Sequence, residues 1–140
     1  MKRLAELVDL SREHHQSLKL ARRCLDTLET GNNEQIENLC REIADQFDHT
    51  WERHFRHEEE TIFQLTAAMS GRIRQLSEQL LAEHQRMRDM ATRMKDGDCS
   101  PLQTFGELLR DHTRLEEREL FPLVEKQFTP EQLARIREYS

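Results

Sequence analysis

Apolar residues recur at helical spacing along most of this chain, and short polar segments containing Gly or Pro separate the periodic stretches. This pattern predicts amphipathic helices. We expect four long helices and a short fifth one, at residues 4–29, 34–68, 72–95, 101–127 and 130–139. Because short connections favour antiparallel neighbours, the expected fold is all-α, an up-down-up-down antiparallel four-helix bundle with a short C-terminal fifth helix. A chain of 140 residues is expected to form one domain, residues 1–140.

Capping signals mark several of the expected helix ends. Gly31 is expected to stop the first helix, and Asn33 is expected to cap the second. Thr129-Pro130-Glu131-Gln132 resembles a capping box that would start the fifth helix. Pro122 falls late in the fourth helix, where it is expected to bend or weaken the last turns.

Polar side chains interrupt the apolar stripes at five positions, which are His54, Glu58, His84, His112 and Glu116. Burying a carboxylate without a partner costs several kcal/mol or forces the group to take up a proton. Bound metal ions would offset the carboxylate charges and use the imidazole lone pairs. A single buried His is more often a hydrogen-bonded core residue, so the prediction of a metal site rests on the whole set.

The first helix offers a sixth polar residue, which is either His14 or His15. Aligning the two halves of the chain on His15 and His84 matches the apolar Leu18 with another apolar residue. Aligning on His14 would put the polar Ser17 at that position. We therefore favour His15 as the ligand and keep His14 as the alternative.

A ten-residue pattern, His-x-x-x-Glu-Glu-x-x-apolar-Phe, occurs twice, at 54–63 and at 112–121. A His and a Glu four residues apart lie on one face of a helix. Two such helices facing each other would offer imidazoles and carboxylates to a pair of metal ions. Glu59 and Glu117 lie one step off this face, so we expect them at the surface or in contact with the ligands, not on the metal.

The ligand types narrow the choice of metal. Imidazoles and carboxylates without thiolate suit Fe, Mn or Zn, and six ligands are too many for one closed zinc site. Ferritin-like bundles use a Glu-x-x-His motif, but no Glu in this sequence stands three residues before a His.

The pattern resembles the hemerythrin family, specifically the bacterial hemerythrin-like or HHE cation-binding domains. The resemblance covers almost the whole chain and rests on Glu13-His14-His15-x-x-Leu18, His54-x-x-x-Glu58-Glu59, Glu83-His84-x-x-Met87 and His112-x-x-x-Glu116-Glu117. It implies two non-haem iron ions, with Mn or Zn as alternatives. It also implies that Glu58 and Glu116 bridge the ions, with His15 and His54 on one iron and His84 and His112 on the other.

The sequence departs from the oxygen-carrying hemerythrins at two positions. Those carriers have a second His four residues after the third-helix His, where this chain has Arg88. They also have an Asp five residues after the fourth-helix His, whereas Glu116 follows His112 by four. One iron would therefore lack an imidazole, and a water, a hydroxide or another side chain is expected in its place.

Open coordination favours a protein that binds or senses dioxygen, nitric oxide or peroxide over a reversible oxygen carrier. Signalling would require a separate partner protein, and we predict no catalytic residues. The alternative is a di-iron enzyme or iron-donating factor, acting in peroxide reduction or iron–sulfur cluster repair. Family members that repair clusters usually carry an N-terminal Cys-bearing segment, whereas this sequence starts at the first expected helix, which disfavours repair.

Composition adds three expectations. The formal net charge of −6 argues against nucleic-acid binding. The sequence has no apolar run of membrane-spanning length and no secretory apolar block, so we expect no membrane partner and a cytoplasmic protein. Cys24, Cys40 and Cys99 are odd in number and form no Cys-x-x-Cys motif, which favours reduced thiols.

Overall fold

The computed structural model describes residues 3–139, and every regular element in this range is helical. The expected all-α class is confirmed. Residues 1, 2 and 140 of the expected domain lie outside the described part. None of the helices within residues 3–139 combines the length and apolar character needed to cross a membrane.

The described helices form four long rods and one short one. The first rod comprises the short 3₁₀ turn η1 (Ala5–Leu7) and α1 (Val8–Glu29). The second rod comprises α2 (Asn33–Phe47), η2 (Asp48–Glu52), α3 (Arg53–Glu58), η3 (Glu59–Phe63) and α4 (Gln64–Thr66). The third rod is α5 (Arg72–Lys95). The fourth comprises α6 (Leu102–Leu115), η4 (Glu116–Leu120) and α7 (Phe121–Gln127), and the short rod is α8 (Pro130–Glu138).

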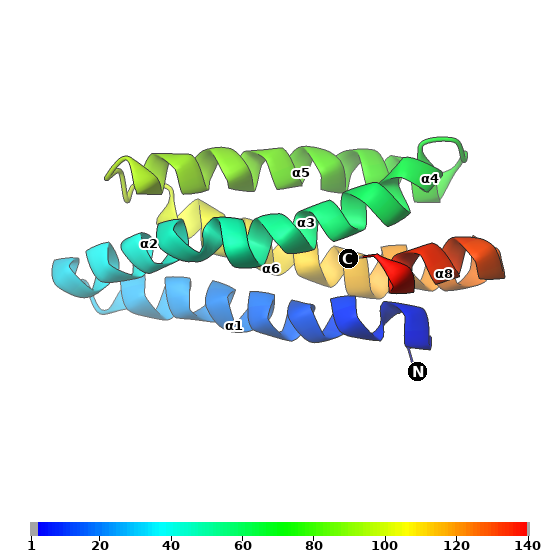
Figure 1. The fold of residues 1–140 in the computed structure, drawn as a ribbon. Helices are drawn as coiled ribbons and strands as arrows, with labels where there is room; N and C mark the ends of the chain where they lie inside the picture. The colour runs from blue at the N-terminus through cyan, green and yellow to red at the C-terminus, as the bar shows by residue number, and fades with distance from the viewer. Residues whose placement is uncertain (1–2, 140) are drawn as a thin grey trace.

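The long rods pack side by side along their length (Figure 1), with α1 against α6 and α2 against α5. The first described element, η1, lies at the end of the bundle where α4 and α8 are found. Gly106 permits the close approach of α6 to α1, because a Cβ atom at this position would lie 2.8 Å from the Cβ of Cys24. Real Cβ atoms essentially never approach this closely, so any larger residue at this position would push the two helices apart.

Of two helix caps expected from the sequence, one lies at a different residue and the other is confirmed. Asn32, and not Asn33, caps α2, because its backbone is extended and its Oδ1 accepts a hydrogen bond of 3.1 Å from the Gln35 amide. Asn33 is instead the first helical residue. The capping box of Thr129 and Gln132 at the start of α8 is confirmed, with both reciprocal hydrogen bonds present.

Three π-helical turns, η2, η3 and η4, interrupt the rods that the sequence predicts as continuous helices. The first, η2, ends two residues before the first copy of the repeated motif, whereas η3 lies within that copy and η4 within the second. Single π turns inside α-helices are often found at functional sites. The last of them, η4, ends two residues before Pro122. Because Pro122 has no amide hydrogen, it cannot donate the hydrogen bond that regular α-helical geometry would make to a carbonyl one turn earlier.

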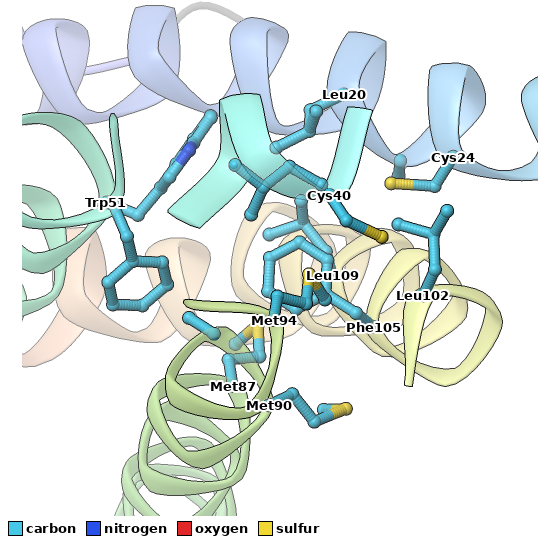
Figure 2. Packing of buried hydrophobic residues seen from close by; sticks show 14 of the residues in the cluster. Leu20, Cys24, Cys40, Trp51, Met87, Met90, Met94, Leu102, Phe105 and Leu109 are labelled. Carbon is cyan, nitrogen blue, oxygen red and sulfur yellow. The ribbon is translucent and has the colours of Figure 1, made fainter. Parts of the chain in front are cut away.

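Two apolar clusters fill the interior, and buried polar residues separate them along every long rod. The first cluster joins α1, α2, α5 and α6 and includes Trp51, Met87, Met90, Met94 and Leu109 (Figure 2). The second lies toward the other end of the bundle, around Leu7, Leu10, Ile62, Ile73 and Leu120. On α5, for example, Leu80 belongs to one cluster and Met87 to the other, with His84 between them.

The cysteines differ from the expectation of three reduced thiols. Cys40 on α2 and Cys99 in the α5–α6 connection form a disulfide, with a Cα–Cα distance of 6.0 Å. This separation is ordinary for a disulfide, and it arises because packing brings together residues 59 positions apart. Cys24 is free and buried in the first apolar cluster, where burial raises the pKa of its thiol to about 12.

Candidate metal centre

Six buried polar residues meet in the layer between the two apolar clusters. Each is at most 4% exposed, and they come from four rods: His14, His54, Glu58, His84, His112 and Glu116. Five of the six residues expected from the sequence are therefore brought together. The first-helix position is the exception.

His14 lies in the cluster, whereas His15 is exposed, so the structure brings the alternative, and not the favoured residue, to the centre. The buried stripe of α1 runs through Leu10, His14 and Ser17, spaced four and three residues apart. Ser17 tolerates burial because its hydroxyl donates to the Glu13 carbonyl at 3.3 Å. The alignment failed because it treated this small, internally bonded residue as a surface residue.

Glu58 lies among three imidazoles. Its Oε2 is 3.2 Å from His14 Nε2 and 3.3 Å from His54 Nε2, while its Oε1 is 3.1 Å from His84 Nε2. Each of these nitrogens points toward the centre of the layer, because the opposite ring nitrogen is bonded outward. The carboxylate therefore spans both sides of the cluster.

Glu116 provides the second shared carboxylate. Its Oε1 is 3.2 Å from His14 Nε2 and 3.0 Å from His112 Nε2. The polar atoms consequently divide into two groups of equal composition, each suited to one ion. One group contains His14 and His54 and the other contains His84 and His112, with Glu58 and Glu116 common to both, and the ligand atoms within each group lie within 4.8 Å of one another.

A carboxylate binds the outer nitrogen of each imidazole. The Nδ1 atoms of the four rings donate to Glu117 for His14 at 2.6 Å, Glu13 for His54 at 2.8 Å, Glu59 for His84 at 2.7 Å and Glu83 for His112 at 2.8 Å. Such partners fix the tautomer and ring orientation of metal-binding histidines and increase their basicity. With Nδ1 carrying hydrogen, Nε2 of the neutral ring has a free lone pair that faces the centre.

The sequence predicted part of this outer set. Glu59 and Glu117 were expected off the metal, at the surface or in contact with the ligands, and the structure places them in contact with His84 and His14. Glu13 and Glu83 were given no role. The available signal was that a Glu directly precedes a His in both halves of the chain.

Arg88 does not enter the cluster. Its guanidinium donates to Glu52 and forms an ion pair with Glu59, outside the ring of imidazoles. The third rod therefore contributes one imidazole, that of His84. Each of the two groups of potential ligands then contains two imidazoles and the two shared carboxylates.

The cluster leaves atoms that protein contacts do not satisfy. Glu58 Oε1, His84 Nε2, His112 Nε2 and both carboxylate oxygens of Glu116 are buried without a hydrogen-bond partner. Lone pairs on nitrogen and oxygen repel each other at about 3 Å unless a proton or a cation lies between them. The donor set and its unsatisfied atoms thus fit bound cations.

Without cations, protons take over this role. Burial acts to lower the pKa of His54, but the charge of Glu58 and hydrogen bonds to Glu13 and Glu58 outweigh it and raise the pKa to about 9. Burial acts in the same way on His112, and Glu116 together with Glu83 raises its pKa to about 9. For Glu58, burial acts to raise the pKa, but the neighbouring imidazoles lower it well below its usual range.

These features define a class of protein, a helical bundle whose buried imidazoles and carboxylates have the ligand types and spacing to hold cations. The family model of the hemerythrin HHE cation-binding domain matches residues 6–124. The chain therefore belongs to the hemerythrin HHE cation-binding family. Comparison with curated proteins finds no significant match, and neither does comparison with solved structures.

Proposed function

We propose that the chain is one hemerythrin-like domain, with its four long rods in up-down-up-down order and α8 as the short fifth helix, and that its core binds two metal ions. The observation that carries this proposal is the pair of matched ligand groups with unsatisfied buried atoms. A purely structural cluster would have to take up protons between these atoms, or leave them unpaired at a cost of several kcal/mol.

In this proposal, His14 and His54 bind one ion, His84 and His112 bind the other, and Glu58 and Glu116 bridge them. Non-haem iron is the favoured metal, because nitrogen and oxygen donors without thiolate suit it. Mn and Zn accept the same donors and remain the alternatives.

We further propose that the loaded site binds or senses dioxygen, nitric oxide or peroxide. Two imidazoles and two shared carboxylates leave room for a small ligand at each ion, and iron would supply the chemistry that binds it. The apolar clusters on both sides limit the entry of water. Sensing would require a separate partner protein. The alternative function is that of a di-iron enzyme in peroxide reduction, or of an iron donor in iron–sulfur cluster repair.

Metal binding is tested with the double variant His54→Ala/Glu116→Ala, loaded anaerobically with ferrous iron and analysed for bound metal. Each proposed ion loses at least one ligand in this variant, so we expect iron binding to be abolished. His15→Ala is the matched control, because this imidazole is exposed, and it should retain the wild-type iron content. Unchanged iron in the double variant would contradict the proposal.

The two functions are separated by reducing the iron-loaded protein and exposing it to dioxygen. A long-lived oxygenated spectrum that reverses when the gas is removed supports ligand binding. Rapid irreversible oxidation, or multiple turnovers with peroxide, supports the enzymatic alternative.

A further inference from the structure

Arg88 lies one turn after His84 on α5. A single side chain, that of Glu59, connects its guanidinium to the His84 imidazole. Its Nε and Nη2 donate to the Glu52 carboxylate at 2.6–3.0 Å, and its Nη1 lies 2.9 Å from Glu59 Oε2. The same Glu59 oxygen accepts the hydrogen bond from His84 Nδ1 at 2.7 Å. The forked guanidinium thus holds the carboxylate that holds the imidazole.

Arg88 also contacts the residue that covers the face of His84. The guanidinium carbon is 5.7 Å from the centroid of the Phe55 ring, within the range of a cation–π contact. Phe55 stacks on the His84 imidazole, with ring centroids 4.0 Å apart and planes inclined by 13°. Both the outer edge and one face of this imidazole are therefore bounded by side chains that Arg88 touches.

The carboxylates behind the other three imidazoles are held differently. Glu117 accepts a hydrogen bond from Ser11 at 2.8 Å, and its ion pair with Arg3 is longer, at 3.4 Å. Glu83 accepts from the neutral Gln79 at 3.1 Å. The Glu13 side chain is 50% exposed, and within residues 3–139 its carboxylate accepts a hydrogen bond only from His54.

We propose that Arg88 is a positioning residue for His84, which it acts on through Glu59 and Phe55. Holding these two side chains keeps the imidazole turned so that Nε2 faces the centre of the cluster. The inference rests on the proposed function, because its consequence concerns the ion that His84 and His112 would bind. The ion between His14 and His54 has its own outer carboxylates and does not depend on Arg88.

The test is a zinc titration of chelator-treated protein, followed by calorimetry, for the wild type and for Arg88→Met. Methionine retains an unbranched stem beside Phe55 but removes the fork that holds Glu59. We expect two zinc ions per wild-type chain. In Arg88→Met, we expect one ion to bind as before and the other to bind roughly 10- to 100-fold more weakly. Arg88→Lys retains the charge without the fork and should give an intermediate value.

The matched control is Arg74→Met, which removes an arginine from the same helix. Arg74 forms an exposed ion pair with Glu78 four residues later and does not contact the cluster. Both zinc affinities should therefore remain at the wild-type level in this variant. Circular dichroism of the metal-free variants checks their fold, and if Arg88→Met unfolds, the comparison of Arg88→Lys with Arg74→Met provides the test.

Solvent exchange of the imidazole Nδ1 hydrogens, measured by nitrogen-15 NMR on the zinc-loaded protein, provides a second readout. The His84 signal should exchange faster in Arg88→Met, while those of His54 and His112 stay unchanged. The role of Arg88, but not the proposed function, would be overturned if Arg88→Met weakened the binding of both ions equally. Unchanged affinities together with an unchanged His84 signal would overturn that role as well. Failure of the wild-type protein to bind two ions would instead overturn the proposed function.

Discussion

Glu117 accepts a hydrogen bond of 2.6 Å from His14 Nδ1, although 103 residues separate the two in the chain. This bond closes a circle, because each outer carboxylate binds an imidazole of the next rod. Glu13 of the first rod holds His54 of the second, and the Glu59–His84 and Glu83–His112 bonds continue the series. The fourth rod returns to the first through Glu117. The circle orients all four rings and ties all four long rods together at the level of the site.

Replacing Glu117 with Gln should weaken metal binding without disrupting the cluster itself. The amide retains the shape of the side chain but removes the negative charge that polarises His14, so the affinity for one ion should fall roughly 10- to 100-fold. The measurement is a zinc titration of the metal-free variant. Glu119→Gln is the matched control, because Glu119 lies in the same π turn but pairs with Arg72 at the surface. Equal losses in both variants would refute a specific role for Glu117.

The two adjacent histidines of α1 should behave differently when replaced by Ala. His14→Ala removes a buried side chain of the cluster, so we expect the loss of one of the two proposed ions in a metal analysis. His15→Ala changes an exposed position and should leave the metal content unchanged. The reverse result would restore the assignment that the sequence alignment favours.

The stability of the metal-free protein should decrease as the pH rises from 6.5 to 9. The ordinary His pKa is 6.5, whereas that of folded His54 and His112 is about 9, because their carboxylate neighbours favour the charged rings. The resulting stabilisation is fully present below pH 6.5 and is lost as the pH rises through 9, amounting to a few kcal/mol, on the order expected for such shifts. Urea unfolding of chelator-treated protein at several pH values measures this change.

The metal-loaded protein provides the contrast for this pH series. Metal ions require neutral imidazoles, so the apparent metal affinity should increase over the same interval. A free energy of unfolding that stays constant or rises between pH 6.5 and 9 in the metal-free protein would contradict the charge arrangement described above.

Reducing the Cys40–Cys99 disulfide should lower the stability of the fold. The bond closes a loop over a sequence separation of 59, and releasing such a loop costs roughly 2–4 kcal/mol. Urea unfolding with and without reductant measures this difference. The Cys99→Ala variant should not respond to reductant, because the remaining thiols are Cys40 and the buried Cys24. If the reductant has no effect on the wild type, the disulfide is absent or does not stabilise the protein.

Local sequence patterns predicted the helices of this protein and most of the residues in its buried polar cluster. Apolar periodicity predicts the helices, and the repeated His-x-x-x-Glu pairs lie on one face of their rods because helical geometry fixes their spacing. His84 could be predicted in the same way, since it stands on a stripe of apolar residues. These predictions depend only on interactions within a helix and on the burial of one face.

The errors occurred where a contact between rods decides the outcome. His14 and His15 differ by a rotation of about 100° around the same helix, and the packing of α1 selects one of them. The π turns were missed because regular periodicity gives no signal for a local widening of the helix. The Cys40–Cys99 bond depends on the approach of the α5–α6 connection to α2.

The sequence by itself therefore determined the helical class and five of the six clustered residues, because spacing along a helix places side chains on its faces. Only the tertiary structure decided which imidazole of α1 turns inward, which carboxylate holds each ring, and that Arg88 binds Glu59 outside the cluster. These outcomes depend on distances between side chains of different rods. Packing sets those distances, and spacing along a single rod does not.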